Sequence, residues 1–112
     1  MDQLTKYRKI VRDVLTPIAR RRYSSPAIPH EAVFDDTNDR YLVLTVAWEG
    51  RVRRVHHYLV HLDIIDGNIW IQRDGTEDGI AYALEAEGVP KADIVLAFHS
   101  EEVRLHTGYA VS

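Results

Sequence analysis

The 112-residue sequence contains no cysteine, and no stretch of it is long and apolar enough for a membrane anchor. Without cysteine the chain has no disulfide, no thiolate metal ligand and no cysteine nucleophile. The start of the sequence lacks the apolar segment of a signal peptide, and no apolar run approaches the roughly 18 residues of a membrane span. We therefore expect a soluble, cytoplasmic protein without membrane contact.

The sequence also lacks an excess of positive charge, since its formal net charge is -3. A negative net charge disfavours general nucleic-acid binding, because binding to phosphates rewards a large positive excess. Basic residues nevertheless gather at two places, and guanidinium groups suit phosphate recognition. The basic patch residues are Arg20, Arg21, Arg22, Arg51, Arg53 and Arg54. Solvated loop charge is the favoured interpretation, with direct DNA binding through these clusters as the alternative.

Motifs for catalysis are missing as well. The serines lack the Gly-x-Ser-x-Gly context of a hydrolase, and no glycine-rich lysine loop for phosphates is present. His61 and Asp63 share one face of a predicted strand, but His57 lies about 20 Å along the strand from Asp63, too far to share an ion. We assign no catalytic residue, metal or cofactor, and a metal-dependent enzyme on His61 and Asp63 is the less favoured alternative.

Two segments have the pattern of helices. Apolar residues from Leu4 recur at helical spacing, Asp2 is placed to cap the helix, and Pro17 predicts that it ends near Thr16 or kinks there. A second helix is predicted to begin at an N-cap on Thr76 and to stop before residue 90.

The region between these helices has the pattern of strands. Strands are predicted at residues 31–35, 41–48, 52–64 and 68–73, with a fifth at 94–98, followed by a docked tail at 103–111. The sequence therefore predicts one α+β domain over residues 1–112: an antiparallel meander of four to five strands, with one helix before it and one after. Two-residue loops at 49–50 and 66–67 predict four opposite pairs: Ala47 with Val52, Tyr41 with Tyr58, Ile64 with Ile69, and Leu62 with Ile71.

This register gives the sheet one core face and a second face that is too apolar for water alone. Tyr58 falls on the core face, which also has His56 and Arg54 as polar exceptions. Either the first helix or the tail covers the second face, or the face is a protein interface, because interfaces favour aromatic residues. The candidate interface residues are Trp48, Trp70, Leu44, Leu59, His57 and His61.

Several collinear segments resemble the XisI family. They are His-Leu-Asp-Ile at 61–64, Gly-Asn-Ile-Trp-Ile-Gln at 67–72, Asp-Gly-Thr-Glu at 74–77, Gly-Val-Pro-Lys at 88–91, Asp-Ile-Val-Leu at 93–96 and Thr-Gly-Tyr-Ala-Val at 107–111. Ala97, Ser100 and Tyr109 depart from the family pattern without disturbing the match.

The resemblance implies a cyanobacterial factor that controls excision of the fdxN element during heterocyst differentiation. A separate recombinase performs the excision, and the expected partner is a nuclease-like XisH-like protein. Together with the residue patterns, the resemblance predicts a non-enzymatic regulatory protein that acts by protein contacts. We expect it to act as a homo-oligomer (dimer or higher) or with the XisH-like partner, and we expect its contact with DNA to be indirect. The resemblance transfers no functional residue.

Overall fold

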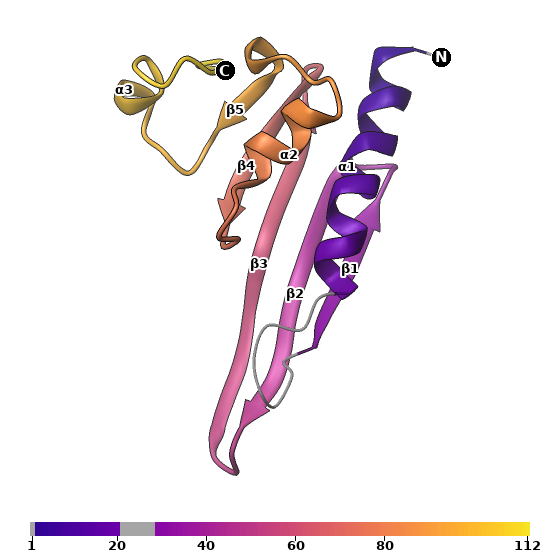
Figure 1. Cartoon of the computed structure of the whole chain (residues 1–112), viewed down its shortest axis with the longest axis vertical. Coiled ribbons are helices and arrows are strands. Elements are labelled where there is room, and N and C mark those ends of the chain that lie inside the picture. The colour runs from indigo at the N-terminus through magenta and orange to yellow at the C-terminus, as the bar shows by residue number, and fades with distance from the viewer. Residues whose placement is uncertain (1, 21–28) are drawn as a thin grey trace.

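A computed structural model describes residues 2–20 and 29–112 of the chain as an α+β fold. Figure 1 shows the elements, which are helix α1 (Gln3–Arg20), strands β1 (His30–Asp35), β2 (Arg40–Glu49), β3 (Arg53–Ile65) and β4 (Asn68–Asp74), helix α2 (Ile80–Ala86), a short 3-10 turn (Lys91–Asp93), strand β5 (Ile94–Leu96) and helix α3 (Glu101–Arg104). The predicted fold class is confirmed. None of the described helices has the length and apolar character to cross a membrane.

Helix α1 begins as predicted and ends later than predicted. The Asp2 carboxylate accepts a hydrogen bond from the Thr5 N–H at 2.7 Å, and this contact lowers the pKa of Asp2. Pro17 lies inside the helix, which continues to Arg20, so of the two predicted alternatives the end near Thr16 is wrong. The apolar stripe explains the continuation, because Ile18 is buried in the core one residue beyond the proline.

The sheet has the order β1-β2-β3-β4-β5, and its first four strands are antiparallel neighbours. The predicted pairs Ile64–Ile69 and Leu62–Ile71 are confirmed across the β3–β4 hairpin. The positive φ of Asp66 and Gly67 fits the tight turn between them.

The predicted register between β2 and β3 is wrong. Tyr41 lies opposite Leu62, and Ala47 lies opposite Val55. Two features move the register: residues 50–52 form a three-residue loop where two residues were expected, and a bulge interrupts the pairing beside Val43.

Strand β5 is parallel to β4, and helix α2 supplies the crossover between them. The strand ends at Leu96, earlier than predicted. The tail docks through a single parallel bridge between Val95 of β5 and Ala110.

Helix α2 begins later than predicted and has a different capping residue. Thr76 does not cap it; the Asp74 carboxylate accepts from the Ile80 N–H at 2.8 Å and from the Thr76 N–H at 2.9 Å. Asp74 therefore ties the end of β4 to the start of α2.

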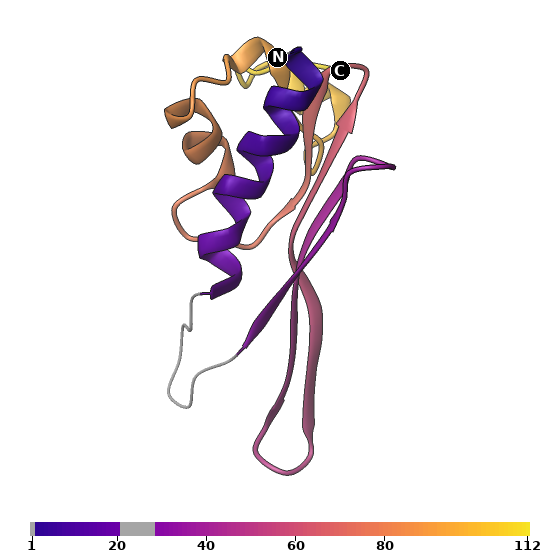
Figure 2. The same ribbon diagram turned by 90° about the vertical axis from the view of Figure 1, so that its right-hand side faces the viewer.

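Helices α1 and α2 lie on one side of the sheet (Figure 2). The core between these helices and the sheet contains fully buried side chains from both, including Tyr7, Leu15, Tyr41, Leu62 and Leu84.

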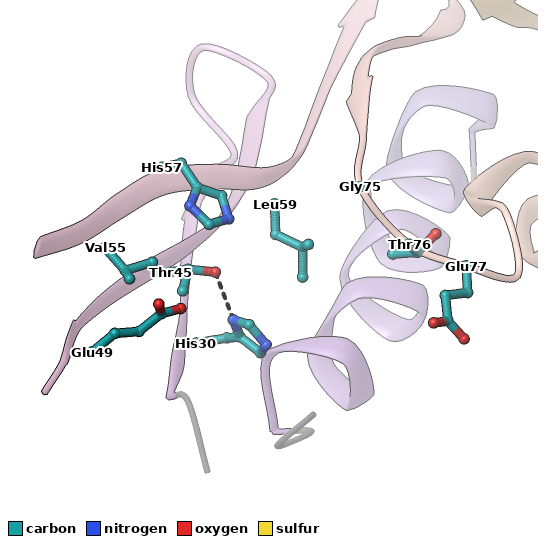
Figure 3. A pocket seen from close by; sticks show the side chains of 9 residues that line it. All are labelled: His30, Thr45, Glu49, Val55, His57, Leu59, Gly75, Thr76 and Glu77. Carbon is teal, nitrogen blue, oxygen red and sulfur yellow. Dashed lines mark hydrogen bonds between the residues drawn. The ribbon is translucent and has the colours of Figure 1, made fainter. Parts of the chain in front are cut away.

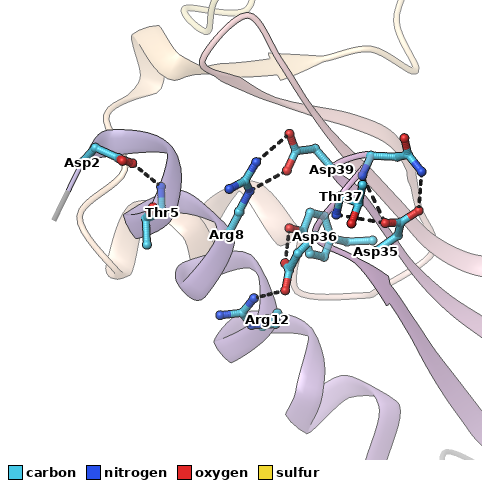
Figure 4. Close-up of polar contacts among 10 residues, drawn as sticks. Asp2, Thr5, Arg8, Arg12, Asp35, Asp36, Thr37 and Asp39 are labelled. Carbon is cyan, nitrogen blue, oxygen red and sulfur yellow. Dashed lines mark hydrogen bonds and ion pairs between the residues drawn. The ribbon is translucent and has the colours of Figure 1, made fainter.

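Ion pairs at the edge of this core orient α1. Figure 4 shows Arg8 bound to Asp39 at 2.7 Å and Arg12 bound to Asp36 at 2.5 Å, which connect α1 to the turn between β1 and β2.

Candidate interaction surface

Two bulges decide which side chains point toward the helices. In β3, Val60 lies opposite Val43 and Tyr58 lies opposite Leu44, so Leu59 is an extra residue in the strand. In β4, Gln72 is extra in the same way, between the partners of His61 and Leu62. Each bulge reverses the alternation of side chains along its strand.

The first bulge turns part of β3 over relative to the sequence prediction. Leu59 packs against the core, and both Leu59 and His57 line a cavity of about 300 Å³ on the helix side of the sheet (Figure 3). The His30 ring and the Thr45 hydroxyl, 2.8 Å apart, close part of its wall. The placement of His57 and Leu59 on the second face is therefore wrong.

For Tyr58 the difference between prediction and structure is the reverse. It was predicted on the core face, but it lies opposite Leu44 and is 49% exposed. His56 and Arg54 lie opposite Val46 and Trp48 and accompany it. Opposite residues of an antiparallel pair share a face, so all three belong to the side away from the helices.

We call this side the open face. Its residues form two columns: the apolar column on β2, consisting of Leu42, Leu44, Val46 and Trp48, and the polar column on β3, consisting of Arg54, His56, Tyr58 and His61. Figure 2 shows no helix over this side along the long β2–β3 hairpin, which extends beyond the end of α1. Of the six candidate interface residues, Leu44, Trp48, His61 and Trp70 lie on the open face.

Trp48 is the most exposed aromatic residue of the open face, at 59%. The Arg54 guanidinium lies over its ring, 5.1 Å from the centroid. Such a contact holds the indole in place without burying its outer side.

The arginines of the hairpin tip do not form one patch. Arg53 pairs with Glu49 at 3.1 Å, on the face opposite to that of Arg54, because successive strand residues alternate. Arg20 is exposed at the end of α1, while Arg21 and Arg22 lie outside the described residues.

A charged cluster anchors the open face near the body of the protein. The buried carboxylate of Asp63 contacts His61 Nε2 at 2.9 Å and Arg40 at 3.3 Å, and accepts from the Gln72 amide at 3.3 Å. The sequence prediction that His61 and Asp63 share a face is confirmed by this contact. Over residues 2–20 and 29–112, no three His, Asp or Glu side chains are grouped to hold a metal ion.

The C-terminal segment covers the Trp70 end of the open face. Arg104 of α3 lies over the Trp70 ring, 5.6 Å from its centroid, and the Asn68 amide donates to the Ser112 carbonyl at 3.0 Å. The indole N–H of Trp70 is buried without an acceptor among the described residues. The tail therefore covers Trp70 and leaves Trp48 exposed.

Sequence reasoning did not assign Tyr58, His56 and Arg73 to this face. Arg73 lies opposite His61 and donates to the Tyr58 carbonyl at 2.6 Å. Gln72 is the extra residue of the second bulge and Arg73 follows it. No local sequence signal marks either bulge.

These features define a class of protein: a small α+β domain with a five-stranded sheet, whose one face is covered by α1 and α2 and whose other face is exposed along a long hairpin. The sequence profile of the XisI protein family matches residues 1–111. The chain belongs to the XisI family, as the resemblance predicted.

Two solved structures have the same fold. A XisI-like protein from Anabaena variabilis is 33% identical, with a TM-score of 0.89 over 97% of this chain and 99% of that chain. The fdxN element excision controlling factor XisI from the same organism is 32% identical, with a TM-score of 0.85 over 99% of this chain and 100% of that chain. No curated protein matches the sequence.

Proposed function

We propose that this chain is a non-enzymatic regulatory factor that controls the excision of a DNA element by binding a XisH-like protein. The family match and the relative named as an excision controlling factor support the process. The single observation that supports binding is the open face, where Trp48 stays 59% exposed on a sheet whose helices α1 and α2 cover the other side. Large exposed aromatic residues on a contiguous face are typical of interaction surfaces.

Co-expression tests this function. The chain and a XisH-like protein from the same genome should purify as one complex, and the complex should persist through size-exclusion chromatography. Two proteins that elute separately at micromolar concentration would contradict the proposal.

Direct DNA binding through the arginine clusters is less well supported. Arg53 and Arg54 point to opposite faces, Arg53 is paired with Glu49, and the net charge is -3. A salt-dependent mobility shift of duplex DNA by the chain alone would favour it.

Self-association to a dimer or higher oligomer, and a cytoplasmic location, stay predictions. Sedimentation velocity of the purified chain tests the first, and fluorescence microscopy of a tagged chain tests the second.

A further inference from the structure

The two columns of the open face differ in chemistry and run side by side. The apolar column supplies Leu42, Leu44 and Val46, all half-buried, and ends at Trp48. Val33 of β1 lies opposite Leu42 and extends this strip to the neighbouring strand. Burial of such a strip on binding is favourable, at roughly 25 cal/mol for each Å² removed from water.

The polar column and the neighbouring strand β4 carry positively charged groups of the open face. Arg54 and Arg73 supply two guanidinium groups, and His56 and His61 supply further hydrogen-bonding groups between them. Interfaces arrange their charges so that a positive patch meets a negative one.

The described carboxylates of this face already accept hydrogen bonds or form ion pairs within the chain, with one exception. Asp63 is buried against Arg40, and Asp35 accepts hydrogen bonds from the Thr37 and Asn38 N–H groups. Among the described strand residues of the open face, Glu31 is the carboxylate without such a partner. Arg54 and Arg73, in contrast, are guanidinium groups of this face that have no carboxylate partner among the described residues.

We infer that the open face binds an acidic partner surface, in which an apolar ridge lies on the apolar column and carboxylates meet Arg54 and Arg73. This inference rests on the proposed function and specifies the chemistry of the partner. A second copy of the chain fits less well, because it would bring the same two guanidinium groups to the contact, and Glu31 is the one carboxylate of its described open-face strands without a hydrogen bond. Duplex DNA fits less well, because phosphates contact cations and leave Leu44, Val46 and Val33 without a partner.

The test measures the affinity of the purified full-length chain for the XisH-like protein by isothermal titration calorimetry. Trp48→Ala and Arg54→Glu should each weaken binding at least tenfold, as at the centre of other interfaces. The wild-type affinity should also fall as the salt concentration rises. Circular dichroism should show that both exposed substitutions leave the fold intact.

Two matched controls lie on the helix side. Tyr82 of α2 is an aromatic residue that is 70% exposed, and Lys6 of α1 is an exposed cation. Tyr82→Ala and Lys6→Glu should bind as the wild-type chain does.

The results of this titration distinguish a failure of the inference about the open face from a failure of the proposed function. Binding by the wild-type chain that Trp48→Ala and Arg54→Glu leave unchanged would overturn the inference and leave the function standing. Absence of binding by the wild-type chain would overturn the function.

Two further results would also overturn the inference. In the first, the chain alone is a dimer that Trp48→Ala converts to a monomer, so that a second copy occupies the face. In the second, the chain binds duplex DNA in a manner that Arg54→Glu abolishes.

Discussion

Arg54 and Trp48 lie directly opposite each other on β3 and β2, and the guanidinium of Arg54 lies over the indole ring. The pair sits near the end of a hairpin that extends beyond the helices (Figure 1). A residue in this position contributes little to the core, since Trp48 is absent from the buried cluster. Its large apolar ring is explained more simply by a contact with another molecule.

The first prediction concerns the close approach of Gly75 to the bulge in β3. The Gly75 N–H donates to the Leu59 carbonyl at 2.8 Å, and a Cβ on residue 75 would lie 2.9 Å from that oxygen. Gly75→Ala should therefore destabilise the protein by about 1–3 kcal/mol in urea denaturation. In a Leu59→Ala background most of this loss should remain, because the carbonyl stays in place. A neutral Gly75→Ala substitution would show that the strand shifts freely.

The second prediction concerns the junction of β4 and α2. Asp74→Ala removes the acceptor of the Ile80 and Thr76 N–H groups and should cost about 1–2 kcal/mol of unfolding free energy. Glu77→Ala, which changes an exposed carboxylate nearby, is the control and should be close to neutral. Equal effects of the two substitutions in thermal unfolding would contradict the role of Asp74.

The third prediction compares two arginines that pair with carboxylates of different burial. Arg40→Ala leaves the buried Asp63 carboxylate without its guanidinium partner and should cost about 1–3 kcal/mol. Arg12→Ala breaks a pair with the half-exposed Asp36 and should cost about 0–1 kcal/mol. Chemical denaturation of both variants checks the order, and a larger loss for Arg12→Ala would contradict it.

The fourth prediction concerns stability at high pH. Burial, together with the hydrogen bond to Glu85, raises the pKa of Tyr109 to about 12, and burial likewise raises the pKa of Tyr7 and of Tyr41. Tyrosine in an unfolded chain has a pKa of about 10, so the folded state holds its proton more tightly. This contribution to stability is complete below pH 10 or so and is lost as the pH rises through about 12.

Denaturation midpoints measured between neutral pH and about pH 12 test this loss of stability with rising pH. Tyr109→Phe removes one ionising hydroxyl and should flatten the decline. A wild-type chain whose stability is constant over this range would contradict the cited shifts.

Much of the fold followed from the sequence, because its signals are local. Helical spacing fixed the apolar face of α1, and Asp66 with Gly67 fixed the β3–β4 turn and the pairing of Ile64 with Ile69. The end of α1 was not predicted correctly. The helix continues beyond Pro17 because burial of Ile18 in the core outweighs the lost backbone hydrogen bond.

The sequence predicted the residues of the open face only in part. Alternation correctly placed Trp48, Leu44, His61 and Trp70 together, but one extra residue at Leu59 exchanged the faces of His57 and Tyr58. A bulge depends on contacts between segments that are distant in the sequence, and the close approach of Gly75, just after β4, to Leu59 is such a contact. Strand alternation within one segment does not contain that information.

The fluorescence of Trp48 tests the central claim most directly. The chain has two tryptophans, so Trp70→Phe leaves Trp48 as the single reporter. Because the Trp70 indole N–H has no acceptor in the described structure and phenylalanine keeps a ring beneath Arg104, this variant should stay folded. Addition of the XisH-like protein, itself made free of tryptophan, should shift Trp48 emission to shorter wavelength and protect it from acrylamide quenching. Formation of the complex with unchanged emission and quenching would contradict the account.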